Sequence, residues 1–525
     1  MLSKPGKDPK FPQSYRPISL LSSLGKIFEK VLQKRINSYC DSSNIIPKEQ
    51  FGFRAQHSTI HQLLRVTNSI TEGMNNKFYT VGIFLDIQKA FDQVWHDGLI
   101  YKLIQLNFPK YLINILKSFL ENRTFRVVIH GETSNMGVNK AGTPQGSVLN
   151  PILYSIFTSD FPSHPRTITC LFADDSAVLA QGTTIKYILR TLQSFLVSLE
   201  EWLTKWRIAV NTDKTKAIIF RKGCTNFNPT NLELFDETIE WVTEVKYLGL
   251  IIDNKLTFRQ HISYLKEKFW AKIYLCLPLI GRNSSLSLEN KLILFKQVLR
   301  PILTYAAPIW GLAAPSNRKK VQTLQNKLLR IIVNAPWFIR NSVIHSDLQI
   351  ESIEDHIQKL SRKFFSGIID HPSNLIADQT DFTEFTGRYR YPYTTTKWSP
   401  PLKFFLINSI LFFIISTRGV HPSPLLFIFY FLVQRESIVI VKKFELEILT
   451  NLHVLDLPDS EKHNFGIMSV CVCVCEHDNS QTIRATGIKF GMWSLNIICR
   501  FLSNFGQNPS TGILSVSIFD NMRTL

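Results

Sequence analysis

Two short apolar segments of this sequence end in aspartates, and this pattern limits the possible folds more than any other feature. Residues 81–85 (VGIFL) run directly into Asp86, and residues 168–172 (ITCLF) lead to the adjacent pair Asp174 and Asp175. Short continuous apolar runs predict buried β-strands. Carboxylates at the ends of such strands put negative charge at the edge of a core, where it is costly unless it has partners.

The acidic pair is expected to lie in a tight turn. Another apolar run, residues 176–180 (SAVLA), follows it at once, so the two runs predict a β-hairpin. Like charges this close raise each other's pKa unless cations lie among them. Two Mg²⁺ ions held by strand-end carboxylates resolve this conflict and stabilise both reacting oxygens of a phosphoryl transfer. A single aspartate in a turn is more often a capping residue, but the whole set favours metal binding.

The remainder of residues 1–255 mixes helical and strand patterns, which predicts an α+β fold. The expected helices cover residues 23–38, 148–157 and 185–206, and the further expected strands cover residues 217–220 and 246–252. The residues expected to share one apolar face of the first helix are Leu24, Ile27, Phe28, Val31, Leu32 and Ile36.

Residues 256–378 are rich in helical patterns and in basic residues. Helices are expected over residues 286–305 and 318–333. Their basic residues are expected to lie in solvent or to follow the backbone of a nucleic-acid duplex; they are Lys319, Lys320, Lys327 and Arg330. Trp310 and Trp337 are expected in the core rather than as platforms for stacked bases.

A turn rich in Pro and Gly, residues 141–149 (AGTPQGSVL), lies between the two acidic sites. Such a turn allows the backbone to approach a ligand closely. By itself it indicates only a turn, but its place after one strand-end aspartate and before a pair of them gives it more weight.

Eight sequence blocks follow one another over residues 1–378: KPGKDP…SYRPISLLSSLGKIFEKVLQKRI, QFGFRAQHSTIHQL, FLDIQKAFDQVWHDGL, GTPQGSVLNPILYSIFTSD, LFADDSAVLA, NTDKTKAIIF, VKYLGLIID and LRPILTYAAPIWG. In this order they resemble the reverse transcriptases of non-LTR (LINE-type) retrotransposons. The residues within the blocks are most similar to those of the jockey-like clade. The resemblance implies a right-hand polymerase with fingers, a palm with an antiparallel sheet, and a helical thumb.

The same resemblance implies the domain limits. Residues 1–255 correspond to fingers and palm, residues 256–378 to the thumb and the region after it, and residues 379–400 to a linker. Residues 401–525 do not resemble the family. Family members of this clade carry an amino-terminal endonuclease, which this sequence lacks, so a truncated copy is expected.

The tail has two further features. Its apolar runs, FFLINSILFFII and LLFIFYFLV, are shorter than the roughly 18–20 residues of a membrane-spanning helix, so no membrane anchor is expected. Its repeat CVCVC, residues 471–475, is the peptide that a translated TG dinucleotide repeat gives. We therefore expect the tail to be translated noncoding DNA.

By resemblance, Asp86, Asp174 and Asp175 correspond to the catalytic metal ligands, and Lys214 to the residue that protonates the leaving pyrophosphate. Phe91 corresponds to the bulky residue that excludes a ribose 2′-hydroxyl; an ordinary core phenylalanine is the alternative. The other residues implied to contact the incoming nucleotide are Ile87, through its carbonyl, Gln145, Gly146, Arg16 and Arg54. The residues implied to form the hairpin that holds the primer end are Tyr247, Leu248 and Gly249.

The family implies two Mg²⁺ ions, for which Mn²⁺ can substitute. The implied partners are an RNA template, a DNA primer or nicked target DNA, dNTPs and the element's own RNA-binding protein. The 60 Lys and Arg against 41 Asp and Glu, a net charge of +19, agree with a nucleic-acid partner. Reaction in the nucleus after synthesis in the cytoplasm is expected.

Two alternatives remain open at this point. An inactive relic of a retrotransposon would bind RNA without copying it; three intact carboxylates count against it, and the truncation and tail count in its favour. An RNA-dependent RNA polymerase would share the palm, but Phe91 and the FADD turn count against it.

Overall fold

The residues that the computed structural model describes are 2–3, 8, 10–11, 14–129, 131–223, 229–380, 387–398, 413–414 and 427–428. The chain divides into two compact units, Met1–Pro401 and Leu402–Leu525. The described residues of the second unit form β16 (Phe413–Ile414) and β17 (Phe427–Ile428), which pair in antiparallel fashion. The Cys-Val repeat lies outside the described residues, and the finer domain limits remain a prediction.

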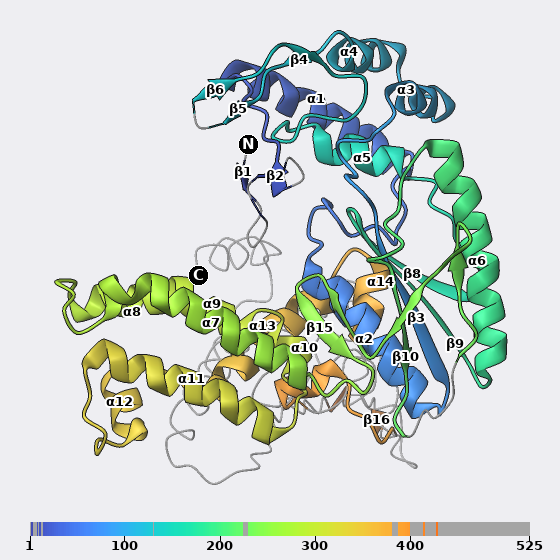
Figure 1. The fold of residues 1–525 in the computed structure, drawn as a ribbon. Coiled ribbons are helices and arrows are strands. Elements are labelled where there is room, and N and C mark those ends of the chain that lie inside the picture. Colours follow the sequence, from blue (N-terminus) through green and yellow to red (C-terminus); the bar gives the residue numbers. More distant parts are fainter. Residues whose placement is uncertain are drawn as a thin grey trace, which may run out of the picture. The chain divides into compact units, whose positions relative to one another are not determined.

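A five-stranded sheet lies at the centre of the first unit, in the order β13-β10-β3-β9-β8 (Figure 1). Its strands are β3 (Tyr79–Asp86), β8 (Thr167–Phe172), β9 (Asp175–Gly182), β10 (Lys216–Phe220) and β13 (Glu240–Val242). Neighbours run antiparallel except β10 and β13. The expected strands at residues 81–85, 168–172, 176–180 and 217–220 are thus confirmed, each slightly longer than predicted.

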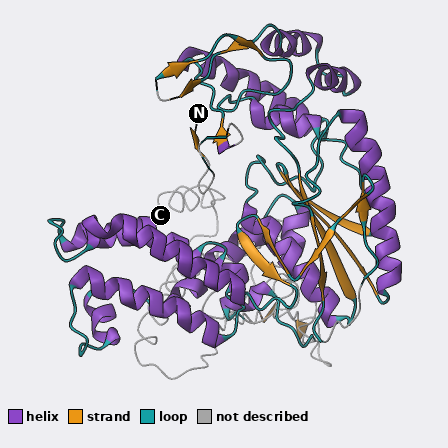
Figure 2. Cartoon of the chain, in the orientation of Figure 1, coloured by secondary structure: helices purple, strands orange, loops and turns teal. Residues whose placement is uncertain are grey.

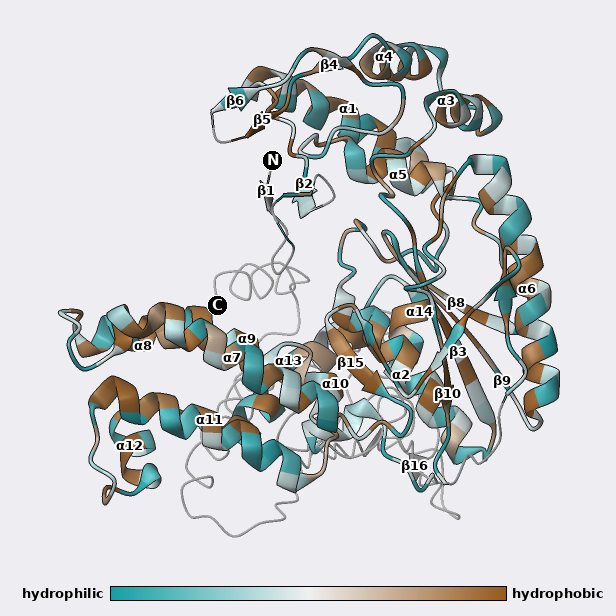
Figure 3. Ribbon diagram, viewed as in Figure 1, coloured by the Kyte–Doolittle hydropathy of each residue, from teal (hydrophilic) through white to brown (hydrophobic). Residues whose placement is uncertain are grey.

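Two helices cover the sheet. The first, α6 (Ile185–Trp206), packs on β3 and β9 and has the predicted bounds. The second, α2 (Thr59–Asn75), packs on β3, β8 and β9, and Figure 1 shows it on the other side of the sheet from α6. Figure 3 shows that the strands between these helices are mainly hydrophobic, which agrees with burial on both faces.

The helices beside one end of the sheet are α1 (Ser23–Ser42), α3 (His96–Gln105), α4 (Lys110–Leu120) and α5 (Asn150–Phe157). The short strands here are β1 (Leu2–Ser3), β2 (Tyr15–Arg16), β4 (Thr124–Phe125), β5 (Val128–Ile129), β6 (Glu132–Thr133) and β7 (Gly137–Val138). The expected apolar face of α1 is partly wrong: Leu32 and Ile36 are buried, but Leu24, Ile27, Phe28 and Val31 are exposed. The buried side of α1 instead includes Glu29.

A strand predicted over residues 246–252 is in fact a hairpin. Its strands are β14 (Glu244–Tyr247) and β15 (Leu250–Asp253), which pair in antiparallel fashion. Leu248 and Gly249 form the turn, both with positive φ. A smaller hairpin, β11 (Glu233–Leu234) with β12 (Glu237–Thr238), packs near α6.

A series of helices follows β15 (Figure 2). They are α7 (Arg259–Ile280), α8 (Leu288–Leu294), the π-helix η2 (Phe295–Leu299), α9 (Arg300–Thr304), α10 (Ala307–Trp310), α11 (Pro315–Val333), α12 (Asn341–Asp347), α13 (Ile353–Ile369), α14 (Asn374–Ala377) and the 3-10 helices η3 (Asp378–Thr380) and η4 (Pro392–Thr396). We call residues 259–347 the helical arm.

The expectations for the arm are met in part. The continuous helix predicted over residues 286–305 is divided into α8, η2 and α9, because Pro301 has no N–H to bond the preceding turn. Trp310 is fully buried, as predicted, whereas Trp337 is exposed, so that prediction is wrong. No helix within the described ranges has the length and apolar character that crossing a membrane requires.

Candidate active site

The β8–β9 hairpin and the end of β3 bring the three predicted carboxylates to one end of the sheet. Ala173 and Asp174 form the turn between β8 and β9, and Ala173 takes a positive φ of 58°. Asp86 is the direct cross-strand partner of Asp175. The predicted hairpin with an acidic turn is therefore found, and it faces the acidic end of the central strand.

The carboxylates are partly buried and repel one another. Burial raises the pKa of Asp174, the charge of Asp86 raises it further, and a backbone hydrogen bond and Arg16 oppose this shift. Burial, followed by the charges of Asp174 and Asp86, raises the pKa of Asp175 to about 6. Negative charge at this end of the sheet is thus incompletely compensated by the protein itself.

Lys214 reaches the same place from the loop before β10. Its Nζ lies 3.1 Å from Oδ2 of Asp86; the Lys214 side chain is 66% exposed and that of Asp86 is 42% exposed. The loop is fixed by the N–H of Asn211, which donates to the carbonyl of Asp86 at 2.8 Å. Within the described residues, no three His, Cys, Asp or Glu side chains converge into a metal-binding group. Carboxylate oxygens are nevertheless the donors that hard divalent cations prefer.

A glutamine from the QFGFR block braces the acidic hairpin. Oε1 of Gln50 accepts the N–H groups of Ala173 (2.9 Å) and Gly52 (2.8 Å). The backbones are so close that a Cβ on Gly52 would lie 2.2 Å from the nitrogen of Ala173. This block also pairs with the strand itself, since the N–H of Phe51 donates to the carbonyl of Leu171 at 2.9 Å.

Phe91 is half-buried and lies between two other aromatic rings. Its ring centroid is 4.8 Å from that of Tyr154 and 6.0 Å from that of Phe53. Its carbonyl accepts the N–H of Thr143 at 2.9 Å, which ties it to the Pro- and Gly-rich turn. The hydroxyl of Tyr154 is buried without a hydrogen-bond partner. The packing around Phe91 therefore holds its ring in a defined place.

The Pro- and Gly-rich turn packs against two segments. Nε2 of Gln145 donates to Oδ1 of Asp92 at 2.9 Å, and its carbonyl accepts the N–H of Ser19 at 2.7 Å. Gly146 has a φ of 117°, and a Cβ there would lie 2.7 Å from the carbonyl oxygen of Ser19. Glycine is thus required at this position for two independent reasons.

The remaining residues predicted to contact the nucleotide lie in different settings. Arg16 is exposed and close enough to Asp174 to lower its pKa against the effect of burial. Nη1 of Arg54 donates to the carbonyl of Pro47 at 3.2 Å, so this guanidinium is partly engaged. Ile87 is buried and lies opposite Val210 in an isolated antiparallel β-bridge. The two hydrogen bonds of this bridge are made by the residues on either side of Ile87, so its own carbonyl takes no part in them.

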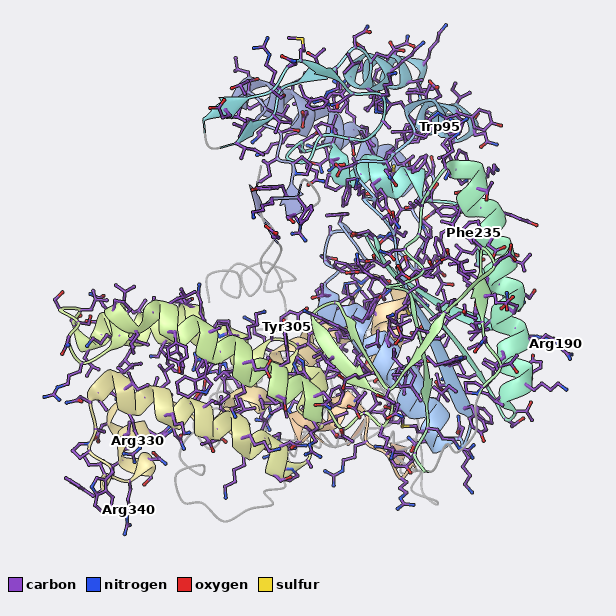
Figure 4. The ribbon with its side chains drawn as sticks, viewed as in Figure 1. Trp95, Arg190, Phe235, Tyr305, Arg330 and Arg340 are labelled. Atoms are coloured by element: carbon purple, nitrogen blue, oxygen red, sulfur yellow. The ribbon has the colours of Figure 1, made fainter. Side chains whose placement is uncertain are left out.

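The residues predicted to hold a primer end form the turn of the β14–β15 hairpin. The hydroxyl of Tyr247 donates to the carbonyl of Cys170 on β8 at 3.2 Å. The hydroxyl of Tyr305, labelled in Figure 4, donates to the carbonyl of Leu248 at 2.6 Å. A Cβ on Gly249 would lie 3.1 Å from the Tyr305 ring. The hairpin is thus linked both to the acidic hairpin and to the helices that follow.

Sequence reasoning missed two residues that position this site, Gln50 and Glu29. Glu29, on α1, is buried, and its Oε2 accepts Oγ–H of Ser147 at 2.8 Å and N–H of Val148 at 2.6 Å. The signal for Gln50 was its place in a recognised block. The signal for Glu29 was a charged residue on the side of a helix that is otherwise apolar.

The comparisons with known proteins agree with this geometry. The family model described as reverse transcriptase (RNA-dependent DNA polymerase) matches residues 3–252. The matched segment contains the central sheet, the acidic hairpin and the Pro- and Gly-rich turn. Residues 3–252 therefore carry a domain of the reverse transcriptase family, which implies the use of divalent metal ions.

Within that family the chain is similar to polymerases of non-LTR retrotransposons. It is 42% identical over 383 residues to "RNA-directed DNA polymerase from mobile element jockey" of Drosophila melanogaster, covering 71% of this chain and 42% of that protein. It is 37% identical over 383 residues to "Probable RNA-directed DNA polymerase from transposon BS" of the same species, with the same coverage. The chain thus spans about two fifths of the length of these relatives.

Among solved structures, the apo telomerase of Candida tropicalis aligns with 66% of this chain and 55% of its own, at 14% identity and a TM-score of 0.31. This similarity is too low to bear on fold or function.

Proposed function

We propose that this chain is an RNA-directed DNA polymerase, a nucleotidyltransferase that extends a primer 3′-hydroxyl with dNTPs on an RNA template. The observation that carries the proposal is the register of β3 and β9, in which Asp86 lies opposite Asp175 beside Asp174 in the turn. Three carboxylates at one sheet end, two with raised pKa values, suit a site that binds divalent cations and phosphates.

The ligands of two Mg²⁺ ions, or of Mn²⁺ in their place, would be Asp86, Asp174 and Asp175. When bound, these ions supply a lowered pKa for the attacking hydroxyl and charge neutralisation at the leaving pyrophosphate. The carboxylates fit in kind, and the Asp86 carboxylate would have to leave Lys214, its present partner at 3.1 Å. Lys214, once released, would donate a proton to the pyrophosphate.

The other residues bind and orient the nucleotide. Arg16 and Arg54 present guanidinium groups to the triphosphate, whose oxygens match their planar donors. The carbonyl of Ile87 lies beside the triphosphate, and Gln145 and Gly146 position the base pair. The other contacts are made by Phe91, whose ring excludes a 2′-hydroxyl, and by the primer-holding turn of Tyr247, Leu248 and Gly249.

The proposed partners follow from this reaction. They are an RNA template, a DNA primer or the nicked target DNA, dNTPs and the element's own RNA-binding protein. We place the reaction in the nucleus and the synthesis of the chain in the cytoplasm. The names of the matched relatives favour neither an RNA-dependent RNA polymerase nor a relic that only binds RNA.

The test is primer extension by the purified full chain on an annealed RNA template and DNA primer, with Mg²⁺ and dNTPs. The matched control is Asp174→Asn, which keeps the size of the side chain and removes its charge. Extension by the parent chain and not by the variant supports the proposal. Extension by neither contradicts the proposal and favours an inactive relic.

A further inference from the structure

The loop between α11 and α12, residues 334–340, exposes two large aromatic side chains; we call it the aromatic loop. Trp337 is 90% exposed and Phe338 is 67% exposed. Their rings meet edge to face, with centroids 6.0 Å apart and an interplanar angle of 82°. Tryptophan is usually largely buried in folded proteins, so this loop offers an apolar surface that a partner can cover.

The guanidinium group of Arg330 fixes the shape of the aromatic loop. Its Nε donates to Oδ1 of Asn341 at 2.9 Å, and its Nη1 donates to the carbonyl of Pro336 at 2.9 Å. Its Nη2 donates to the carbonyl of Ile339. Both ends of the loop are thus tied to α11. Because the backbone on either side of Trp337 is held, less conformational entropy is lost when a ligand binds there.

The surroundings of the loop are strongly basic. Residues 259–347 contain 14 Lys and Arg against 3 Asp and Glu. The three atoms that Arg330 binds are uncharged oxygens, so these contacts leave its positive charge uncancelled. Arg340, at the end of the loop, is exposed, and Figure 4 shows Arg330 and Arg340 together at the outer end of α11 and α12. This charge attracts a polyanion rather than an apolar protein surface.

We propose that the aromatic loop binds single-stranded RNA, with one unpaired base stacked on the indole of Trp337 and an adjacent phosphate held by Arg340. An aromatic face accepts any base, but only a base that is not already stacked within a duplex. The contact with Phe338 orients the indole. The choice of RNA rests on the proposed function, which supplies an RNA template, while the binding itself requires no catalysis.

The experiment measures the affinity of the full chain for a labelled U-rich single strand of RNA and for an RNA duplex of equal length, by fluorescence anisotropy. We expect Trp337→Ala to weaken binding of the single strand on the order of 10-fold and to leave duplex binding unchanged, because stacking requires an unpaired base. Trp337→Phe, which retains an aromatic face, should keep most of the affinity. The matched control is Leu275→Ala, an exposed apolar residue of α7 in the same arm.

Three results would overturn the proposal. One is an unchanged affinity of Trp337→Ala for the single strand, and another is an equal loss on the single strand and on the duplex. In the third, the parent chain sediments as a dimer and Trp337→Ala sediments as a monomer, while the affinity for RNA is the same for both. That result would make the loop an interface between copies of the chain. Primer extension by the parent chain is measured in parallel and tests the proposed function separately. If the parent chain does not extend a primer, Trp337→Ala can still weaken its binding of single-stranded RNA, so the two proposals can fail independently.

Discussion

The central sheet and the helical arm place their apolar side chains differently. The inner six residues of β3 are all buried, and its charged residue, Asp86, comes only at the end. In the arm, by contrast, large apolar side chains stay exposed on successive helices, among them Tyr274, Leu275 and Ile293. The sheet therefore acts as a rigid support for a few polar groups, whereas the arm presents an extended, basic surface. Changes in the sheet should affect chemistry or folding, and changes on the arm should affect binding.

The largest effect is expected at the acidic hairpin. Asp174→Asn should reduce the rate of primer extension on the order of 10³-fold or more, because it removes one of three clustered carboxylates. Its affinity for RNA should stay close to that of the parent chain, since the arm is untouched. Steady-state extension kinetics and anisotropy on the same preparation measure both quantities. A parallel loss of RNA affinity would mean that the two regions are not separable.

The second effect concerns a buried lysine whose partner carboxylate, beside α6, is 44% exposed. Lys102 is buried and pairs with Asp160, which also accepts the indole N–H groups of Trp202 (2.7 Å) and Trp206 (3.0 Å). Asp160→Asn should lower the free energy of unfolding by about 2 kcal/mol, because the buried ammonium of Lys102 loses a counterion that solvent partly screens. Lys102→Met removes the charge and should cost far less. Urea denaturation of both variants is the measurement.

The same pair predicts a pH dependence with a definite sign. Burial lowers the pKa of Lys102 from 10.5 to about 8. A base with a lowered pKa in the folded state costs stability where it must be protonated, and this cost is full below about pH 8 and absent above 10.5. The stability of the parent chain relative to Lys102→Met should therefore rise between these two pH values. A difference that stays constant would contradict the burial of a charged lysine.

A smaller effect is expected at the aromatic ring beside the acidic hairpin. Phe91→Ala should raise the use of ribonucleotides relative to deoxynucleotides by about 10-fold to 100-fold, because the ring no longer occupies the space of a 2′-hydroxyl. Tyr154→Phe is the matched control: it keeps the neighbouring ring and removes only its buried, unpartnered hydroxyl. Ratios of kcat/KM for the two substrate classes give the answer. An unchanged ratio for Phe91→Ala would show that another residue discriminates the sugar.

The smallest effect lies on the arm. Lys319 and Lys320 are exposed, and replacing both with Gln should reduce the slope of log affinity against log salt for duplex binding by about 2. Arg318 is the contrast, because its Nε lies 2.8 Å from Glu354. Arg318→Gln should lower the melting temperature and leave the slope unchanged. If the slope of log affinity against log salt is the same for both variants, Lys319 and Lys320 do not contact the duplex.

Local pattern predicted the sheet and its long helix well. The apolar run before Asp86 and the helical spacing of residues 185–206 depend only on neighbours in the sequence, and both agree with the structure. The local pattern predicted one strand over residues 246–252, because the residues that flank Gly249 are apolar. The family resemblance, by contrast, implied a hairpin there, and the positive φ of Gly249 agrees with it. The exposure of Trp337 was missed because burial depends on long-range packing.

In the acidic site, too, local sequence pattern predicted some residues and not others. The three aspartates could be predicted, since each directly follows or interrupts an apolar run. Their supports could not, because Gln50 reaches Ala173 across 123 positions and Glu29 reaches Ser147 across 118. Which polar side chain braces which turn depends on how distant segments meet, and that information is absent from local spacing. The proposed roles of the individual residues remain predictions for the experiments above.

The contact between Gly52 and Ala173 has a consequence for how copies of such an element decay. One added methyl group at position 52 would meet backbone atoms of the acidic turn at 2.2 Å. The change alters no carboxylate, no arginine and no charge, yet it would push aside the turn that carries Asp174. A copy could lose its polymerase while every aspartate is still encoded. An inventory of intact acidic residues is therefore not a sufficient criterion for a functional gene, and the glycine beside them belongs in it.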